Sequence, residues 1–400
     1  MSHFRKKIYA DYASTAPVSK NIVKAMQPFW TDIFYNPSGL YKEGVMAKQA
    51  LQKARSNIAK VLHVQSQNLT FTSGGTESIF IAIWGAIEYA KSQGLKNPHI
   101  ITSTFEHPAV LMSLRHAEKN GVAVTYVNPG ADGKIKVENV IREIKKETVL
   151  ITIMYVNNEI GTIEPIRTLS NEIKKIRVKN KSAFPYFHTD ACQAPNYLVV
   201  DPHTLGVDLL TLDGGKIYGP KGIGLLYIRS GVNLKPVLFG GGQEHGLRPG
   251  TEPMPLIIGL AAAIEETSLL REKEARRIMT LRDYFLKCLE KMFFRWSLNG
   301  SLKDRIPNNV NICIEGLQAE FAVIALGEEG IMVSPGTACD NLNNDINSRT
   351  IEAIGRPFCS KSSLRFTFGR GTVKKDIEMI CKLLPKIVAL CSKKDIPLRS

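Results

Sequence analysis

Short apolar, β-branched runs alternate with longer stretches of helical periodicity from about residue 48 to residue 228. The runs that predict strands are 68–73, 99–103, 122–127, 148–154, 186–189, 207–212 and 222–228. Between them apolar side chains recur every 3.6 residues, as at Ala47, Leu51, Ala54 and Ile58. Strands that alternate with helices predict an α/β domain with a mostly parallel sheet covered by helices on both faces.

The pattern changes after a stretch rich in Gly and Pro at 240–255. A helical pattern at 256–293 is too long for a simple crossover between strands, so a second domain is predicted to begin there. Its remaining elements are a strand at 309–314, a helix at 319–326, a loop around Cys339, a strand at 363–366 and a helix at 373–391. This mixture predicts a smaller α+β domain at the C-terminal end.

Composition adds that the chain is an ordinary globular protein. Of its 400 residues 44% are apolar and 22% are charged, and no apolar run is long enough to cross a bilayer. The net charge of +15 raises the question of nucleic acid. The basic residues are spread over helix faces such as 142–146 and 174–181, without interleaved aromatic residues, so we interpret them as solvated faces. We therefore expect neither a membrane nor a nucleic acid as partner.

The number and spacing of the cysteines indicate the redox state of the compartment in which the protein works. The seven cysteines (192, 288, 313, 339, 359, 381 and 391) are odd in number and most lie in apolar patterns. None forms a CxxC pair, so we expect no metal site. A reducing compartment, and thus a cytoplasmic location, is predicted.

Three features with chemistry lie where predicted strands end. Residues 71–78, FTSGGTES, begin a helix whose free N–H groups can bind phosphate, although such a turn is also common for structural reasons. Asp190 follows strand 186–189, where a helix N-cap is the alternative. Lys216 lies in the glycine-rich turn DGGKIYGPKG. Together they offer a phosphate seat, a partner for a pyridinium nitrogen and an amine, which pyridoxal phosphate requires.

The chain also resembles the cysteine desulfurases of the class V aminotransferase family, most closely the branch for nitrogen fixation and iron–sulfur cluster assembly. The matching motifs occur in order: YADYASTAP at 9–17, NPS at 36–38, FTSGGTES at 71–78, EH at 106–107, VNNEIG at 156–161, HTDACQ at 188–193, KIYGPKG at 216–222, GGGQE at 240–244, RPGT at 248–251, VSPGTAC at 333–339 and SSLRF at 362–366. The resemblance implies the fold type I of pyridoxal-phosphate-dependent aminotransferases. It implies a large cofactor-binding α/β domain at 18–255. Residues 1–17 and 256–400 would then form the small domain that carries the cysteine loop.

The resemblance implies a cofactor site with a defined set of residues. Lys216 would bind pyridoxal phosphate covalently and move protons, while His107 would stack on the cofactor ring. Asp190 would pair with the pyridinium nitrogen and Gln193 with the phenolic oxygen. The remaining implied cofactor contacts are Gly75, Thr76 and Asn158, together with Thr251, which would reach the phosphate of a neighbouring subunit and so implies a homodimer.

It also implies the substrate and the reaction. Arg365, Asn158 and Asn36 would bind the carboxylate of L-cysteine. The thiolate of Cys339 would attack the substrate sulfur, which leaves L-alanine and a persulfide for delivery to an unidentified acceptor protein. The stretch 339–347 is polar and lacks an apolar pattern, which favours a loop able to visit both the cofactor and an acceptor.

The sequence departs from the family immediately before Lys216. The family usually has serine, glycine and histidine there, and the serine and histidine donate to the cofactor phosphate, whereas this chain has Asp213, Gly214 and Gly215. Each lost charge-assisted hydrogen bond is worth about 1.5 to 3 kcal/mol, so the affinity for the cofactor is predicted to fall by about two to four orders of magnitude. A second departure is Tyr41, where the family commonly has histidine.

Two further functions compete with an active desulfurase. A weakly active or non-catalytic homologue, acting as a binding subunit, is favoured by the altered phosphate site. A lyase acting on selenocysteine is disfavoured by Cys339. The sequence leaves open the role of Cys192, which lies between Asp190 and Gln193.

Overall fold

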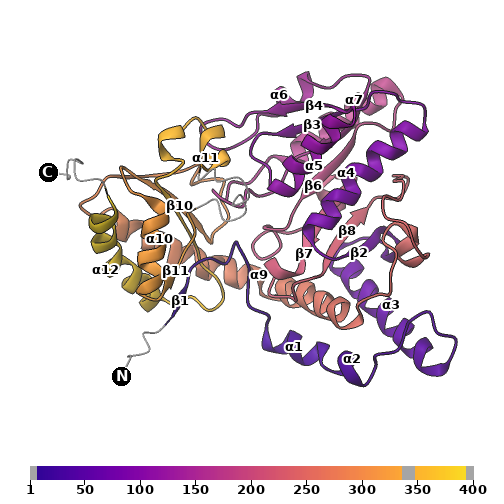
Figure 1. Ribbon diagram of the computed structural model, residues 1–400, viewed down its shortest axis with the longest axis horizontal. Helices are drawn as coiled ribbons and strands as arrows, with labels where there is room; N and C mark the ends of the chain where they lie inside the picture. The colour runs from indigo at the N-terminus through magenta and orange to yellow at the C-terminus, as the bar shows by residue number, and fades with distance from the viewer. Residues whose placement is uncertain (1–6, 336–346, 393–400) are drawn as a thin grey trace.

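The structure is a computed structural model, which describes residues 7–335 and 347–392. Figure 1 shows a larger part, built mainly from the first two thirds of the chain, beside a smaller part that holds the C-terminal elements and the first strand. The long helix α9 (Met254–Leu289) connects them.

A seven-stranded sheet with the order β2-β8-β7-β6-β5-β3-β4 forms the centre of the larger part. Its strands are β2 (Leu69–Thr72), β3 (His99–Ser103), β4 (Ala123–Val127), β5 (Thr148–Thr152), β6 (Tyr186–Asp190), β7 (Leu209–Asp213) and β8 (Gly224–Ile228). Among these seven strands β8 alone runs in the opposite direction to the other six, so the predicted, mostly parallel α/β sheet is confirmed.

Helices cover both faces of this sheet because its strands are apolar on both sides. The helices of the larger part are α1 (Lys20–Met26), α2 (Pro28–Thr31), α3 (Lys42–Leu62), α4 (Gly75–Ser92), α5 (Pro108–Lys119), α6 (Val137–Arg142), α7 (Ile166–Asn180) and α8 (Pro202–Leu205). Successive strand residues point to opposite faces. Thus Ile100 packs with α4 and α5, whereas Ile101 packs in the core formed with α3, α6, α7 and the start of α9.

The smaller part has its own apolar core around a three-stranded sheet of order β12-β10-β9. Its strands are β9 (Trp296–Leu298), β10 (Asn309–Ile314) and β12 (Ser363–Thr367), and β1 (Ile8–Tyr9) pairs with β11 (Ile331–Met332). Its helices are α10 (Ala319–Glu328), α11 (Arg349–Ala353) and α12 (Lys374–Cys391). Ile8 and Ala10 lie in this core, so the start of the chain packs with its C-terminal elements.

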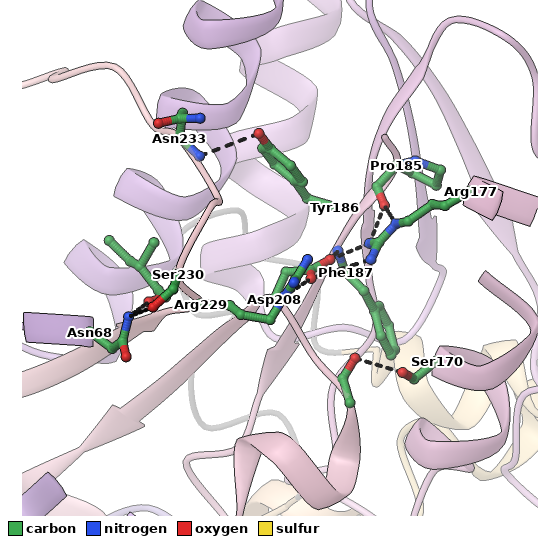
Figure 2. A network of polar contacts seen from close by, with 12 residues as sticks. Asn68, Ser170, Arg177, Pro185, Tyr186, Phe187, Asp208, Arg229, Ser230 and Asn233 are labelled. Carbon is green, nitrogen blue, oxygen red and sulfur yellow. Dashed lines mark hydrogen bonds and ion pairs between the residues drawn. The ribbon is translucent and has the colours of Figure 1, made fainter. Parts of the chain in front are cut away.

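A polar network fixes the amino-terminal ends of the central strands (Figure 2). Asp208, fully buried just before β7, accepts a hydrogen bond from the backbone N–H of Phe187 at 2.7 Å and from Nε of Arg229 at 2.6 Å. Arg177 of α7 pairs with the same carboxylate and donates to the carbonyl of Pro185. This edge of the sheet is therefore occupied by structural pairing.

Two observations bear on the expected cellular environment. Cys313 on β10 and Cys359 form a disulfide with Cα atoms 5.4 Å apart, whereas the cysteine pattern of the sequence predicted a reducing compartment. The two cysteines are 46 residues apart, so the sequence pattern gave no sign that they pair. They meet because β12 pairs with β10 and brings the segment before β12 alongside. Within 7–335 and 347–392, no helix combines the length and apolarity needed to cross a membrane.

Candidate active site

The candidate site lies at the carboxyl-terminal edge of the central sheet, opposite the network of Asp208. Asp190 is the last residue of β6, Asp213 the last of β7, and Gly75 the first of α4. Because parallel strands end at the same edge, residues far apart in the sequence meet there. One pocket is lined by Ala13, Ser14, Gly75, Thr76, Ile79, His107, Met154, Val156, Asn158, Asp190, Cys192, Gln193, Asp213, Lys216 and Arg365.

Lys216 ends a short 3₁₀ turn, Gly214–Lys216, between β7 and β8. Its Nζ donates to the carbonyls of Ala13 at 3.0 Å and Ser14 at 2.6 Å. Nε2 of Gln193 donates to the same Ala13 carbonyl at 2.9 Å. The amine and the amide are therefore held close to one another by the N-terminal segment.

Asp190 is buried at the end of β6, and its Oδ1 accepts the N–H of Cys192 at 2.9 Å. No regular helix begins there, so the alternative of a helix N-cap is wrong. Burial raises the pKa of Cys192 well above its ordinary value, and the nearby Asp190 adds to this rise. Cys192 is therefore a protonated thiol, which is unreactive as a nucleophile.

A buried histidine supports the strand behind Asp190. His188 has Thr152 Oγ1 at 2.8 Å and Thr211 Oγ1 at 3.0 Å from its two ring nitrogens. Burial lowers its pKa to about 4, so the ring is neutral. Both ring nitrogens of this core residue have hydrogen-bond partners, and these bonds connect β5, β6 and β7.

His107 precedes the first residue of α5, and its Nδ1 accepts the N–H of Ala109 at 3.1 Å. The preceding residue, Glu106, is buried, and its carboxyl group accepts from the backbone N–H of Met154 and from Ser103 Oγ. Burial raises the pKa of Glu106 to about 8. Glu106 thus connects β3 to the segment that follows β5. These contacts position the neighbouring His107 and Met154, which line the pocket.

Arg365 reaches the pocket from β12 of the smaller part and is almost fully buried. One terminal nitrogen donates to the carbonyl of Asn158 at 2.8 Å. The other donates to Asp11 Oδ1 at 2.8 Å and to Ser14 Oγ at 2.7 Å. A fixed positive charge is thereby held at the pocket, and its buried Nε has no partner among the described residues.

Most of the residues expected from the sequence meet in this pocket, but two do not. Thr251 and Asn36 are exposed and lie outside its lining. The backbone N–H of Ser38 donates to Asn36 Oδ1 at 2.9 Å, which folds that side chain back on its own turn. Cys339 lies outside the described residues.

Three residues that contact or line the site were not among those predicted from the sequence: Asp11, Ser14 and Met154. Asp11 and Ser14 lie within the motif YADYASTAP, which was the available signal. Met154 carried none, because it lies in a predicted strand as an ordinary apolar residue.

The pocket fits pyridoxal phosphate at one end and conflicts with it at the other. Lys216, Asp190, His107 and Gln193 together offer the amine, acid, ring and amide that the aldehyde and pyridine groups need. At the start of α4, however, the carboxylate of Asp213 already accepts the N–H of Gly75 at 2.9 Å. An internal anion thus binds where the phosphate was expected.

Comparisons with known proteins identify the family of this chain. The aminotransferase class-V family matches residues 8–380. A protein of Dictyoglomus turgidum named cysteine desulfurase IscS is 40% identical over 385 residues, covering 96% of this chain and 95% of the relative. Another of that name from Methanosarcina thermophila is 40% identical over 384 residues, with 96% and 92% covered.

Solved structures give the same result. A NifS-like protein superposes with a TM-score of 0.88 at 28% identity, and the superposition covers 96% of this chain and 100% of the NifS-like chain. A structure described as SspA in complex with cysteine has a TM-score of 0.78 at 34% identity, with 92% and 100% covered. The chain therefore belongs to the aminotransferase class-V family, within its group of cysteine desulfurases.

Proposed function

We propose that this chain is a cysteine desulfurase that converts L-cysteine to L-alanine and passes the sulfur to a cysteine of its own. The observation that carries the proposal is that Lys216, Asp190, His107 and Arg365 line one pocket although they come from four separate segments. The names of the relatives support the same reaction.

Pyridoxal phosphate is the proposed cofactor. When bound, it supplies an electron-poor ring that stabilises negative charge at the α-carbon of the substrate. Lys216 would attach its aldehyde, Asp190 would pair with the pyridine nitrogen, His107 would cover the ring and Gln193 would donate to the phenolic oxygen. Gly75 and Thr76 line the end nearest to α4, where the phosphate would be expected.

The residues of this chain would divide the remaining work between binding and proton transfer. Arg365 would bind the substrate carboxylate, with Asn158 beside it, because its buried guanidinium is aligned by Asp11 and Ser14. The amine of Lys216 would remove the proton from the α-carbon and later protonate the β-carbon of the product.

Cys339 is the proposed sulfur acceptor. Its thiolate would attack the substrate sulfur, so that an S–S bond forms as the C–S bond breaks and the carbon fragment leaves as alanine after protonation. Cys192, the thiol in the pocket lining, is protonated for the reason given above, and Cys359 is bound to Cys313. These observations support Cys339 over both alternatives.

A homodimer, a separate sulfur-acceptor protein and a cytoplasmic location complete the proposal. Thr251 and Asn36 are exposed and lie outside the pocket lining of their own chain, as expected if they serve the pocket of a second subunit. Four of the described cysteines are free thiols, which is compatible with a reducing compartment, whereas the disulfide weighs against it.

The test is a pair of substitutions assayed with pyridoxal phosphate, L-cysteine and a thiol reductant. Lys216→Ala should abolish both the absorbance of lysine-bound cofactor and the formation of alanine. Lys221→Ala is the matched control, because this exposed lysine lies five residues further on and does not line the pocket. Alanine formed by Lys216→Ala would refute the proposal.

Cys339→Ser separates sulfur transfer from cofactor binding. The variant should bind the cofactor as the wild type does, yet mass spectrometry should find no persulfide on the protein after addition of cysteine. A persulfide found on Cys192 or Cys359 in the wild type would instead assign the nucleophile to that residue.

A further inference from the structure

Asp213 bridges the two turns that would have to cradle a phosphate. Its Oδ2 accepts the N–H of Gly75, the first residue of α4, at 2.9 Å. Its Oδ1 accepts the N–H of Gly215, in the turn before Lys216, at 2.8 Å. Each backbone N–H has one hydrogen, so a phosphate could use these two donors only by displacing the carboxylate.

The start of α4 is a favourable place for an anion, and this favours the carboxylate as well as a phosphate. The helix is 18 residues long, and its partial positive charge and the N–H groups of its first turn lie at the end that begins with Gly75. The carboxylate of Asp213 therefore occupies this anion-binding position, which a phosphate would otherwise fill.

The charges around the pocket make a second anion there unfavourable. Asp190 and Asp213 both line it, and Lys216 and Arg365 are the cations of the lining. Arg365 is already paired with Asp11. Lys216 would be bonded to the aldehyde carbon at the other end of the cofactor, while a phosphate would add about two negative charges beside Asp213. Repulsion between the phosphate and Asp213 would then lack a compensating cation.

Gly215 belongs to the same arrangement. A Cβ atom at this position would lie 3.2 Å from Asp213 Oδ1 and 3.2 Å from Cγ of Lys221. A larger residue at 215 would therefore crowd the carboxylate where it now lies. Asp213 and Gly215 are thus mutually compatible, and they form an alternative to a pair of phosphate donors.

We propose that Asp213 determines which form of the cofactor this chain selects, by occupying the anion-binding position at the start of α4. The inference rests on the proposed binding of a pyridoxal ring to Lys216. The chain then binds the ring and the aldehyde but gains little from the 5′-phosphate. Asp213 is a specificity-determining residue, and the unphosphorylated aldehyde pyridoxal binds about as well as pyridoxal phosphate.

The test compares the two aldehydes on the cofactor-free full-length protein. Dissociation constants for pyridoxal and pyridoxal phosphate are measured from the absorbance of the lysine-bound aldehyde. In the wild type we expect the two constants to agree within about tenfold, a difference of at most about 1.4 kcal/mol. In Asp213→Asn and Asp213→Ser, the preference for the phosphate form should rise at least about tenfold, with the constant for pyridoxal unchanged.

Glu77→Gln is the matched control. Glu77 is a carboxylate in the first turn of α4 that pairs with Arg248 and does not line the pocket. Its substitution removes the same charge from the same helix end, and the preference should change by less than about threefold. The unchanged affinity for pyridoxal also shows that each variant is folded.

The outcomes separate this inference from the proposed function. If the wild type prefers pyridoxal phosphate by about a hundredfold or more, and the Asp213 variants do not alter this, the carboxylate moves aside and the inference is wrong. If neither aldehyde binds to the wild type or to either variant, the proposed function fails and the inference fails with it.

Discussion

At the scale of single residues, Glu106 is a buried carboxyl group whose protonation state depends on the fold. Burial raises its pKa from 4.5 to about 8. The folded protein therefore binds one more proton than the unfolded chain between these two pH values. Stability from this group is complete below about pH 4.5 and is lost as the pH rises towards about 8.

Glu106→Gln should make the free energy of unfolding less dependent on pH. The amide keeps an oxygen for the N–H of Met154 and cannot ionise, so the variant should avoid a loss of about 2 to 4 kcal/mol between pH 5 and pH 8. Urea denaturation at both pH values measures this. Glu138→Gln, at an exposed position on α6, is the control. Equal pH dependence in wild type and Glu106→Gln would contradict the prediction.

Residue types indicated much of the site, but not its contacts. Lys216 and Asp190 were recognisable because each ends or follows an apolar strand, and the structure places both in the same pocket. Asp213 was recognised as a departure from the family. Its hydrogen bond to Gly75 joins residues 138 positions apart, so only the packing of α4 beside β7 could reveal it.

At the scale of elements, the sequence predicted strands and helices with strong periodicity and missed short ones. The strand at 309–314 was predicted with the bounds of β10, and the bounds of β3 also agree. In contrast, β1, β9 and β11 contain two or three residues, which is too short for an alternating pattern. They form because tertiary packing brings their partners alongside.

Asp208 offers a test of how β6, β7 and α7 are joined. Asp208→Asn should lower the free energy of unfolding by about 3 to 5 kcal/mol, because it leaves the cation of Arg177 without its buried partner. Arg229→Ala should cost at most about 1 kcal/mol, since the Arg229 side chain is 43% exposed.

The ranking of the two losses, measured by chemical denaturation, is the critical result for this network. An Asp208→Asn variant that is as stable as Arg229→Ala would show that the backbone ladder alone holds this edge of the sheet. Cofactor affinity should not change in either variant, because the network and the pocket lie at opposite ends of the strands.

At the scale of the whole molecule, the exposed apolar side chains are unevenly distributed. Several fall between the start of α2 and the first turns of α3: Trp30, Phe34, Leu40, Tyr41, Val45 and Met46. Phe34 stacks on Tyr35 with ring centroids 4.5 Å apart, and Tyr35 contacts Tyr41, so these three rings form a continuous surface. Apolar surface of this kind is typical of a subunit interface. Asn36 lies within the same segment, which links the surface to the proposed dimer.

Substitutions on this surface should dissociate the dimer without unfolding the chain. Phe34 and Leu40 are 64% and 96% exposed, so Phe34→Ser combined with Leu40→Asp removes little from the core of one subunit. Burial of each such side chain contributes about 1.5 to 3 kcal/mol, and the dimer dissociation constant should therefore rise at least about a hundredfold. Analytical ultracentrifugation measures this against the 44.4 kDa mass of one chain. The control is Val178→Asp, because Val178 is 80% exposed on α7, which Figure 1 shows at the opposite end of the larger part from α2. A monomeric wild type, or a double variant that associates as tightly as the wild type, would show that this surface does not hold two subunits together.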